Sequence, residues 1–244
     1  MPTSSSPAPQ PTGGRQARWQ PHNDRRRERI VTALIELIEE TPMGVEVPMQ
    51  QITERSGLSK SVVYRQFSGR DELDRRTRTA IGDRFTDDID IALDISEGSI
   101  RVILRRTIAA VVDWIDSHPR LYDFLRHGPA LGDPGDVDAV SSLKDRIAGR
   151  TRLLVSGLAG VVGVVDEAAA DTMTFAIVSM TEATVSRWAR DRDRAMGRDE
   201  LVAELAGYAW SVLDGVARAH RLTLDPDEPL LAALARLSSV DTAP

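Results

Sequence analysis

Apolar residues in this chain of 244 residues recur at intervals of three and four, and the alternation typical of a β-strand is sustained nowhere. Glycines and prolines divide the chain into segments of helical length. The pattern therefore predicts an all-α fold. The helices from the fourth onward are expected over about residues 70–93, 97–117, 119–126, 136–162, 166–192, 198–221 and 227–239.

The first helix is predicted to begin at Asp24, whose carboxylate can cap the free N–H groups of a helix start. Residues 41–44 (TPMG) end it. Residues 1–23 are rich in proline, serine and glycine and are expected to form a disordered tail without the apolar core of a secretory signal. The apolar positions of the first helix follow the spacing of one face: Ile30, Ala33, Leu34, Leu37 and Ile38.

Two short helices with a tight turn between them are predicted next. Pro48 suits the first turn of a helix that runs to about Ser56, and Gly57 supplies the left-handed conformation that ends it. Ser59 is a good N-cap for a third helix over residues 60–66. Two short helices joined by a three- to four-residue turn that contains glycine form a helix-turn-helix.

Charge is unevenly distributed along the chain. Residues 15–80 hold 13 Lys and Arg against 10 Asp and Glu, whereas the rest, from residue 81, holds 18 against 27. The formal net charge is -6. A basic segment attached to an acidic body is typical of a nucleic-acid-binding head, because attraction to phosphates supplies most non-specific affinity. An unevenly charged, solvated surface is the alternative.

Composition excludes several kinds of site. The chain has no cysteine, which rules out disulfides, thiolate metal ligands and thiol catalysis. Its four histidines are scattered and no catalytic motif appears, so no catalytic residue, metal or cofactor is expected. The longest weakly polar run, Leu153–Val165, falls short of the roughly 20 apolar residues that span a bilayer. A soluble, cytoplasmic protein is therefore expected.

The stretch VPMQQITERSGLSKSVVYRQFSGRDEL, with the apolar segment RIVTALIELIEE before it, resembles the N-terminal domain of the TetR family of bacterial transcriptional regulators. The match covers Arg25 to Leu73. The resemblance implies a three-helix DNA-binding domain over residues 24–73 and a larger helical bundle over residues 74–240 for ligand binding and dimerisation. It further implies a ligand-responsive regulator, usually a repressor, that binds a palindromic double-stranded DNA operator as a homodimer and has no membrane association.

The resemblance places the third helix in the major groove of DNA. Its basic side chains would donate to guanine or phosphate, Val62 would touch a thymine methyl group, and Tyr64 and Gln66 would hold the backbone. A solvated helix face is the alternative for each. The predicted DNA-binding residues are Ser59, Lys60, Ser61, Val62, Tyr64, Arg65, Gln66 and Arg70.

The segment 97–117 is apolar around much of its circumference, so it should lie at the centre of the bundle. Helical bundles form pockets between their helices, and a small, largely apolar effector is expected there. Plain core packing is the alternative for each candidate. The predicted ligand-binding residues are Val111, Trp114, Ile115, Tyr122, Leu125, His127, Met173, Ile177 and Met180.

The last two long helices mix small and large apolar residues, as at an interface between helix pairs. This resembles the dimer contact of the family, and twofold association would set two recognition helices about one DNA turn apart. Burial against the same subunit is the alternative. The predicted interface residues are Val178, Val185, Trp188, Trp210 and Leu213.

Two other classes of function remain open from the residues alone. A helical ligand-binding or adaptor protein could have lost DNA binding, although Lys60, Tyr64 and the Gly57 turn argue against it. An enzyme is disfavoured by the absence of a catalytic constellation. Titration with DNA at several salt concentrations separates these classes.

Overall fold

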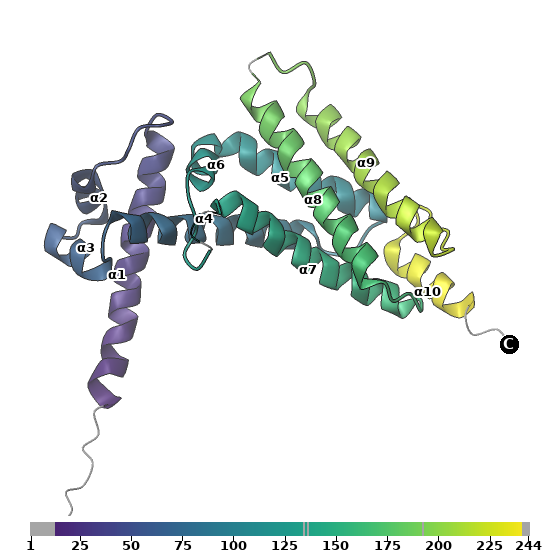
Figure 1. Cartoon of the computed structure of the whole chain (residues 1–244), viewed down its shortest axis with the longest axis horizontal. Helices are drawn as coiled ribbons and strands as arrows, with labels where there is room; N and C mark the ends of the chain where they lie inside the picture. Colours follow the sequence, from purple (N-terminus) through teal and green to yellow (C-terminus); the bar gives the residue numbers. More distant parts are fainter. Residues whose placement is uncertain (1–12, 134, 136, 192, 241–244) are drawn as a thin grey trace, which may run out of the picture. The chain divides into compact units, whose positions relative to one another are not determined.

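A computed structural model describes residues 13–133, 135, 137–191 and 193–240, and the side chains from Asn23 to Ser239 within them (Figure 1). This part of the chain contains ten α-helices and no β-strand beyond an isolated bridge between Ser99 and Pro229. The all-α prediction is confirmed. The helices are α1 (Gly13–Glu40), α2 (Met49–Ser56), α3 (Lys60–Gln66), α4 (Arg70–Ala92), α5 (Ile100–Ser117), α6 (Pro119–Arg126), α7 (Ala139–Val161), α8 (Glu167–Arg190), α9 (Arg198–Ala219) and α10 (Leu230–Val240).

The chain divides into two compact units, Met1–Thr77 and Arg78–Pro244, and the division falls within α4. In the first unit, α1 packs against α2 and α3, which also contact each other. Apolar side chains from all of these helices and from the first turn of α4 are fully buried, because each helix carries them on one face. They include Ile30, Leu34, Ile52, Val63 and Leu73.

The start of α1 differs from the sequence prediction. The helix begins at Gly13, so Asp24 lies inside it and does not cap its first turn. Arg, Gln, Ala and Glu between Gly13 and Ile30 favour helix and carry it further towards the N-terminus. The predicted irregular tail is therefore helical from Gly13 on, and its residues 1–12 lie outside the described part of the chain.

The turn between α2 and α3 has the predicted geometry. Gly57 ends α2 in the left-handed region, at φ 63°, and its N–H donates to the carbonyl of Glu54. The N–H of Leu58 donates to the carbonyl of Thr53, which closes the end of α2. Ser59 then occupies the N-cap position of α3 with extended backbone. The helix-turn-helix is thus present with the predicted ends of α3.

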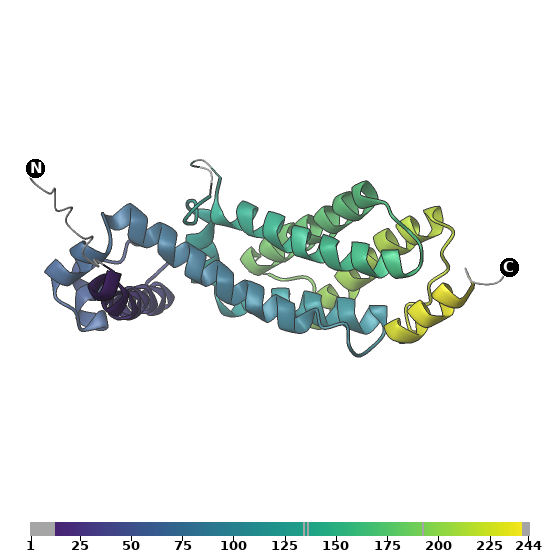
Figure 2. The same ribbon diagram turned by 90° about the horizontal axis from the view of Figure 1, so that it is seen from below.

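In the second unit, α5 packs against α8 and α9, and α7 packs along α8 (Figures 1 and 2). The buried residues of α5 lie on one half of the helix: Ile100, Ile103, Ile108, Val112, Trp114 and Ile115. The prediction that apolar residues bury much of its circumference is wrong, because the other half carries Arg105 and Asp113 and leaves Val102 50% exposed. The last helix, α10, returns to the start of α5. There, Leu230 packs with Ile100 and Ile103.

Several helices of this unit begin about three residues later than predicted, because a polar side chain caps them. Ser99 accepts from the N–H of Val102, so α5 starts at Ile100 rather than at residue 97. Asp138 accepts from the N–H groups of Val140 and Ser141, so α7 starts at Ala139 rather than at residue 136. In the described part of the chain, none of the helices is both long and apolar enough to cross a membrane.

Candidate nucleic-acid interface and ligand cavity

The outward side of α3 carries polar and basic groups. Lys60, Ser61, Tyr64 and Arg65 are exposed, and the Lys60 ammonium lies 5.9 Å from the centre of the Tyr64 ring. On the opposite side of the same helix, Val63 is buried in the core of the first unit. The helix is therefore held by its apolar face while its polar face remains available to a partner.

The two serines at the start of α3 are not used to cap it. The Ser59 hydroxyl makes no capping bond and instead lies 3.1 Å from the Ser61 hydroxyl. That bond uses only one of the two hydroxyl hydrogens, so the pair can donate the other to an external acceptor. Both serines are exposed, and phosphate oxygens are acceptors of the right kind.

Two of the predicted DNA-binding residues make contacts within the fold. Gln66 is only 8% exposed and its Nε2 donates to Oδ1 of Asn23 at 3.4 Å, so the expectation that it reaches DNA is wrong. Arg70 donates to the carbonyl of Val47 at 2.5 Å and to Asp74 at 2.8 Å. Its guanidinium thus holds the loop before α2, and its contact with DNA stays a prediction. Val62 is half-buried.

Arginines of α1 support the helix-turn-helix, and sequence reasoning missed this role. Arg29 donates to the carbonyl of Ser56 at 2.6 Å, and Arg27 donates to the carbonyl of Gln66 at 3.3 Å. These carbonyls lie at the C-terminal ends of α2 and α3, where a cation is favoured by the helix dipole. Part of the basic charge of the first unit is thus structural. The cluster of arginines that precedes the apolar residues of α1 was the sequence signal for this role.

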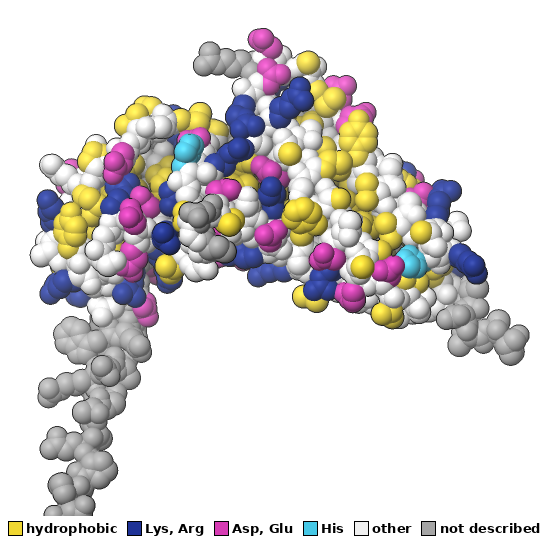
Figure 3. Space-filling model, viewed as in Figure 1, with side chains coloured by type: hydrophobic (Ala, Val, Ile, Leu, Met, Phe, Trp, Pro, Cys, Tyr) yellow, Lys and Arg dark blue, Asp and Glu magenta, His cyan; other side chains and the backbone are white. Residues whose placement is uncertain are grey.

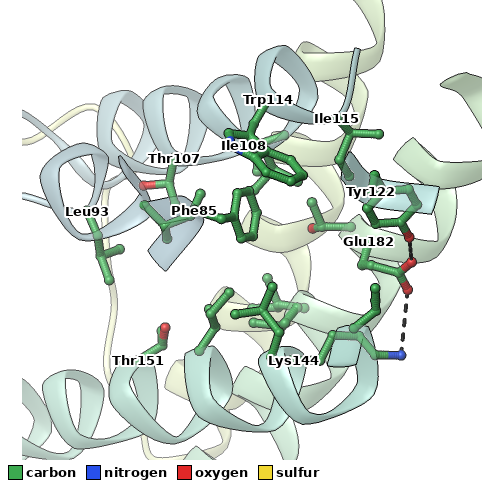
Figure 4. A pocket seen from close by; sticks show the side chains of 18 of the residues that line it. Phe85, Leu93, Thr107, Ile108, Trp114, Ile115, Tyr122, Lys144, Thr151 and Glu182 are labelled. Carbon is green, nitrogen blue, oxygen red and sulfur yellow. Dashed lines mark hydrogen bonds and ion pairs between the residues drawn. The ribbon is translucent and has the colours of Figure 1, made fainter. Parts of the chain in front are cut away.

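The second unit contains an apolar cavity of about 120 Å³ between α4, α5, α6, α7 and α8 (Figure 4). Its aromatic wall is formed by Phe85 and Trp114, whose ring centres lie 4.8 Å apart. Phe85 comes from α4, which sequence reasoning had not connected with the pocket. Of the residues predicted to bind a ligand, six line this cavity: Val111, Trp114, Ile115, Tyr122, Leu125 and Ile177.

The other three predicted ligand residues lie elsewhere. His127 is exposed after the end of α6, and its Nδ1 lies 2.7 Å from the carbonyl of Asp123, so its placement in the pocket is wrong. Met180 is half-buried on α8 and is not part of the wall of this cavity. Met173, four positions before Ile177 on α8, lines a second cavity instead.

That second cavity has a volume of about 230 Å³ and lies among α5, α7, α8, α9 and α10. Its wall is almost entirely aliphatic, with Leu154, Leu158, Leu213 and Leu234 among its residues. Because the cavity is partly open to solvent, its apolar lining stays in contact with water unless an apolar molecule occupies it. An apolar lining of this extent favours a role in binding.

Three polar side chains meet at one end of the first cavity (Figure 4). The Tyr122 hydroxyl donates to Glu182, and the Lys144 ammonium lies 3.6 Å from the same carboxylate. Burial raises the pKa of Tyr122 to about 12, and its bond to Glu182 acts in the same direction. Sequence reasoning identified only Tyr122, because Lys144 and Glu182 stand on different helices and look like surface charges in the sequence.

The predicted dimer residues all contact their own chain, and two of them are buried in it. Val185 and Trp188 are buried, and Trp188 donates through Nε1 to the carbonyl of Met196 at 2.8 Å, so their expected place at an interface is wrong. Val178 and Leu213 line cavities, and Trp210 packs against the cluster around Ile100. The alternative of burial within the same subunit therefore holds for Val185 and Trp188, whereas Val178, Trp210 and Leu213 are half-buried and their place at an interface stays a prediction.

A different side of α8 and α9 is exposed and apolar. Phe175 is 46% and Tyr208 is 52% exposed. Hydrophobic side chains gather over these two helices on the face shown in Figure 3. Small residues separate the aromatic ones, so a second helix pair could approach closely. The exposed residues of this helix face include Phe175, Ala176, Ala183, Tyr208, Ser211 and Gly215.

Comparisons with known proteins agree with this architecture. No protein-family model matches the chain. It is 28% identical over 215 residues to an uncharacterised HTH-type transcriptional regulator of Mycobacterium tuberculosis, covering 85% of this chain and 86% of the relative.

Solved structures of transcriptional regulators have a similar backbone fold. A TetR-family transcriptional regulator from Streptomyces coelicolor is similar with a TM-score of 0.60 and 18% identity, over 88% of this chain and 92% of that one. A TetR-like transcriptional regulator from Rhodococcus sp. RHA1 is similar with a TM-score of 0.52 and 21% identity, over 79% and 96% of the two chains. The chain thus has the fold of the TetR-family transcriptional regulators.

Proposed function

We propose that the chain is a DNA-binding transcriptional regulator that inserts α3 into the major groove and responds to a small effector bound in the second unit. The observation that carries the proposal is the exposed face of α3, where Ser59, Lys60, Ser61, Tyr64 and Arg65 project from a helix whose other side is buried. Lysine and arginine suit phosphate oxygens and guanine edges. The similarity to an HTH-type regulator supports the same function.

The proposed cycle needs no catalytic step. A cytoplasmic homodimer binds a palindromic operator and represses transcription, and the effector shifts it towards a conformation with lower affinity for DNA. Coupling between two such sites is typically about 1–3 kcal/mol, so an effector should weaken DNA binding by roughly 5- to 150-fold. The apolar lining of both cavities supports a largely apolar effector.

The test starts from DNA fragments that the purified chain selects from a random pool. Fluorescence anisotropy then measures the affinity of the chain and of the variant Lys60→Ala/Tyr64→Ala for a selected fragment, over a range of salt concentrations. We expect the double variant to bind at least about tenfold more weakly, since two contacts are lost, with a salt slope reduced by about 1. Arg105→Ala is the matched control, because Arg105 is an exposed cation of the second unit.

Helicity and thermal stability of the variants are compared with those of the parent chain by circular dichroism. Equal affinity of the parent chain and of Lys60→Ala/Tyr64→Ala would contradict the assignment of α3 as the reading helix. A chain that selects no DNA but binds apolar ligands would instead support the adaptor function.

We further propose that the exposed face of α8 and α9 forms the dimer contact. A stable interface needs a buried apolar centre, and Phe175 and Tyr208 provide one between small residues. Light scattering should show a dimer for the parent chain and a monomer for Phe175→Glu/Tyr208→Glu. Arg105 is an exposed residue of α5, so Arg105→Glu serves as a control for added negative charge outside this face. A dimer that survives the double substitution would place the interface elsewhere.

A further inference from the structure

The two cavities of the second unit adjoin. Five residues belong to the walls of both: Leu93, Leu104, Thr151, Ile177 and Val178. In Figure 4, Leu93 and Thr151 lie on one side of the first cavity, whereas Tyr122, Glu182 and Lys144 lie on the other. The chemistry of the wall therefore changes in one direction, from a polar end past aromatic rings to a largely aliphatic end.

The polar end contains a hydroxyl without a partner. Thr181 is only 5% exposed, lines the first cavity, and its Oγ1 has no hydrogen-bond partner among the described residues. Other buried threonines of this chain donate to the carbonyl four residues earlier, as Thr86 of α4 does to Gly82 at 2.7 Å and Thr174 of α8 does to Ala170 at 2.8 Å. Thr181 does not make this bond. A buried hydroxyl without a hydrogen-bond partner lowers the stability of the fold unless a bound molecule accepts from it.

The missing group is a hydrogen-bond acceptor without charge. Among the residues that line the cavity, Glu182 accepts from Tyr122 and pairs with Lys144, so this lining has no net charge when both groups are ionised. Arg126 lies over the Tyr122 ring but is exposed and does not line the cavity. Thr181 can donate one hydrogen, and the Lys144 ammonium has further hydrogens to donate. An ionised carboxylate would add an uncompensated negative charge beside Glu182, whereas a carbonyl oxygen would accept without that repulsion.

We propose that the effector is an uncharged amphiphile, an ester or amide of a long unbranched aliphatic acid. Its carbonyl accepts a hydrogen bond from Thr181, and its hydrocarbon chain passes Phe85 and Trp114 and fills the aliphatic cavity as far as Ala233 of α10. A compound of the size of one ring would fill the first cavity and leave the second empty. The inference rests on the proposed function in one respect, namely that this unit holds an effector.

The first experiment is calorimetric titration of the whole chain with methyl esters of increasing chain length, from methyl butanoate to methyl palmitate. Each added methylene should tighten binding roughly fourfold until the aliphatic cavity is full. Ala233 is fully buried against that cavity, so Ala233→Leu should bring the plateau to shorter esters. Affinity that stops rising once the first cavity alone is filled would overturn the proposed binding mode.

The second experiment tests the polar end with matched ligands and matched variants. The free acid of the same chain length should bind at least about tenfold more weakly than the ester, and Glu182→Gln should reduce this preference. Thr181→Val keeps the shape of the side chain and removes an unpaired hydroxyl, so it should fold normally. It should weaken ester binding about two- to tenfold and leave binding of the corresponding alkane unchanged.

Equal affinity of Thr181→Val and the parent chain for the ester would overturn the role of the hydroxyl, and a preference for the free acid would overturn the charge argument. Release of DNA is measured separately by anisotropy. If the esters bind as expected and DNA is not released, the ligand class holds and the proposed regulation fails. If DNA is released by other compounds while no ester binds, the regulation holds and the ligand class is wrong.

Discussion

The guanidinium of Arg78 on α4 donates to the carbonyl of Phe124 on α6 at 3.0 Å and stacks on its ring, with 4.5 Å between the guanidinium carbon and the ring centre. The same group donates to the carbonyl of His127 at 3.2 Å. These carbonyls mark the C-terminal end of α6, where a cation is favoured. Because α6 also carries Tyr122 and Leu125, a single buried side chain joins α4 to a wall of the cavity.

Replacing Arg78 should therefore destabilise the second unit. Arg78→Met removes the donor to the carbonyl of His127 and leaves the carbonyl of Phe124 only the backbone N–H of His127. We expect a loss of roughly 2–4 kcal/mol in the free energy of unfolding. Urea denaturation followed by circular dichroism measures it. Arg105→Met on exposed α5 surface is the control and should change stability by less than about 0.5 kcal/mol. An unchanged free energy of unfolding for Arg78→Met would mean that these hydrogen bonds make no net contribution to stability.

Gly128 should be sensitive for a related reason. It adopts φ 154°, and a Cβ at this position would lie 3.0 Å from the guanidinium of Arg78. Gly128→Ala should cost roughly 1–3 kcal/mol. In a double-mutant cycle with Arg78→Met, part of that cost should vanish because the steric conflict disappears. Strict additivity of the two effects would contradict the proposed conflict.

Gly57 tests the turn of the helix-turn-helix. Its φ of 63° is left-handed, and a Cβ there would lie 3.3 Å from Nη2 of Arg29. We expect Gly57→Ala to cost about 1–2 kcal/mol in stability and to weaken DNA binding through the altered placement of α3. Gly69→Ala is the matched control, since among the described residues none beyond its chain neighbours lies within 4 Å of the Cβ that would be added there. Thermal unfolding should show little change for the control.

Tyr122 should make stability depend on alkaline pH. Its pKa in the folded chain is about 12, above the ordinary value of 10.0, so the folded state keeps the proton that the unfolded state releases first. The resulting stabilisation is complete below pH 10 and is lost as the pH rises towards 12, by on the order of 2 kcal/mol in total. Denaturation of the parent chain and of Tyr122→Phe across this range measures the difference. Parallel pH profiles would contradict it.

The N-cap of α7 should contribute measurably to stability. Asp138 accepts from the backbone of Val140 at 3.0 Å and of Ser141 at 3.1 Å. Asp138→Ala should lower the free energy of unfolding by about 1 kcal/mol, and Asp138→Asn should recover most of it because its amide oxygen can accept the same bonds. Chemical denaturation of the three proteins compares them. Failure of the asparagine variant to recover stability would point to charge rather than capping.

Local signals allowed the helix-turn-helix and the ends of short helices to be predicted. Gly57 and Ser59 bracket a turn that few other residues permit, and Pro119 marks the start of α6 because its ring suits a first helical turn. The start of α1 was mispredicted because Asp24 has the chemistry of a cap, whereas the residues before it continue the helix. A capping residue is a signal only when the preceding segment does not favour helix.

Which face of a helix turns inward could not be predicted for α8 and α9. Both sides of these helices carry apolar residues, so the periodicity that locates a helix does not choose between Trp188, which is buried, and Phe175, which is exposed. The polar end of the cavity was missed for a similar reason. Lys144 and Glu182 are 38 positions apart in the sequence, and only the packing of α7 along α8 brings them together.

The helix α4 limits how the protein can be divided. A fragment that ends at the boundary of the first unit, Thr77, cuts this helix within its second turn and leaves its new end without a cap. A fragment that keeps the helix to Ala92 exposes Phe85 and Ile89, which otherwise line a cavity. Neither fragment is therefore expected to fold on its own. A chimaera that exchanges the DNA-binding unit between two such chains is best joined inside α4, with both Arg70 and Arg78 retained.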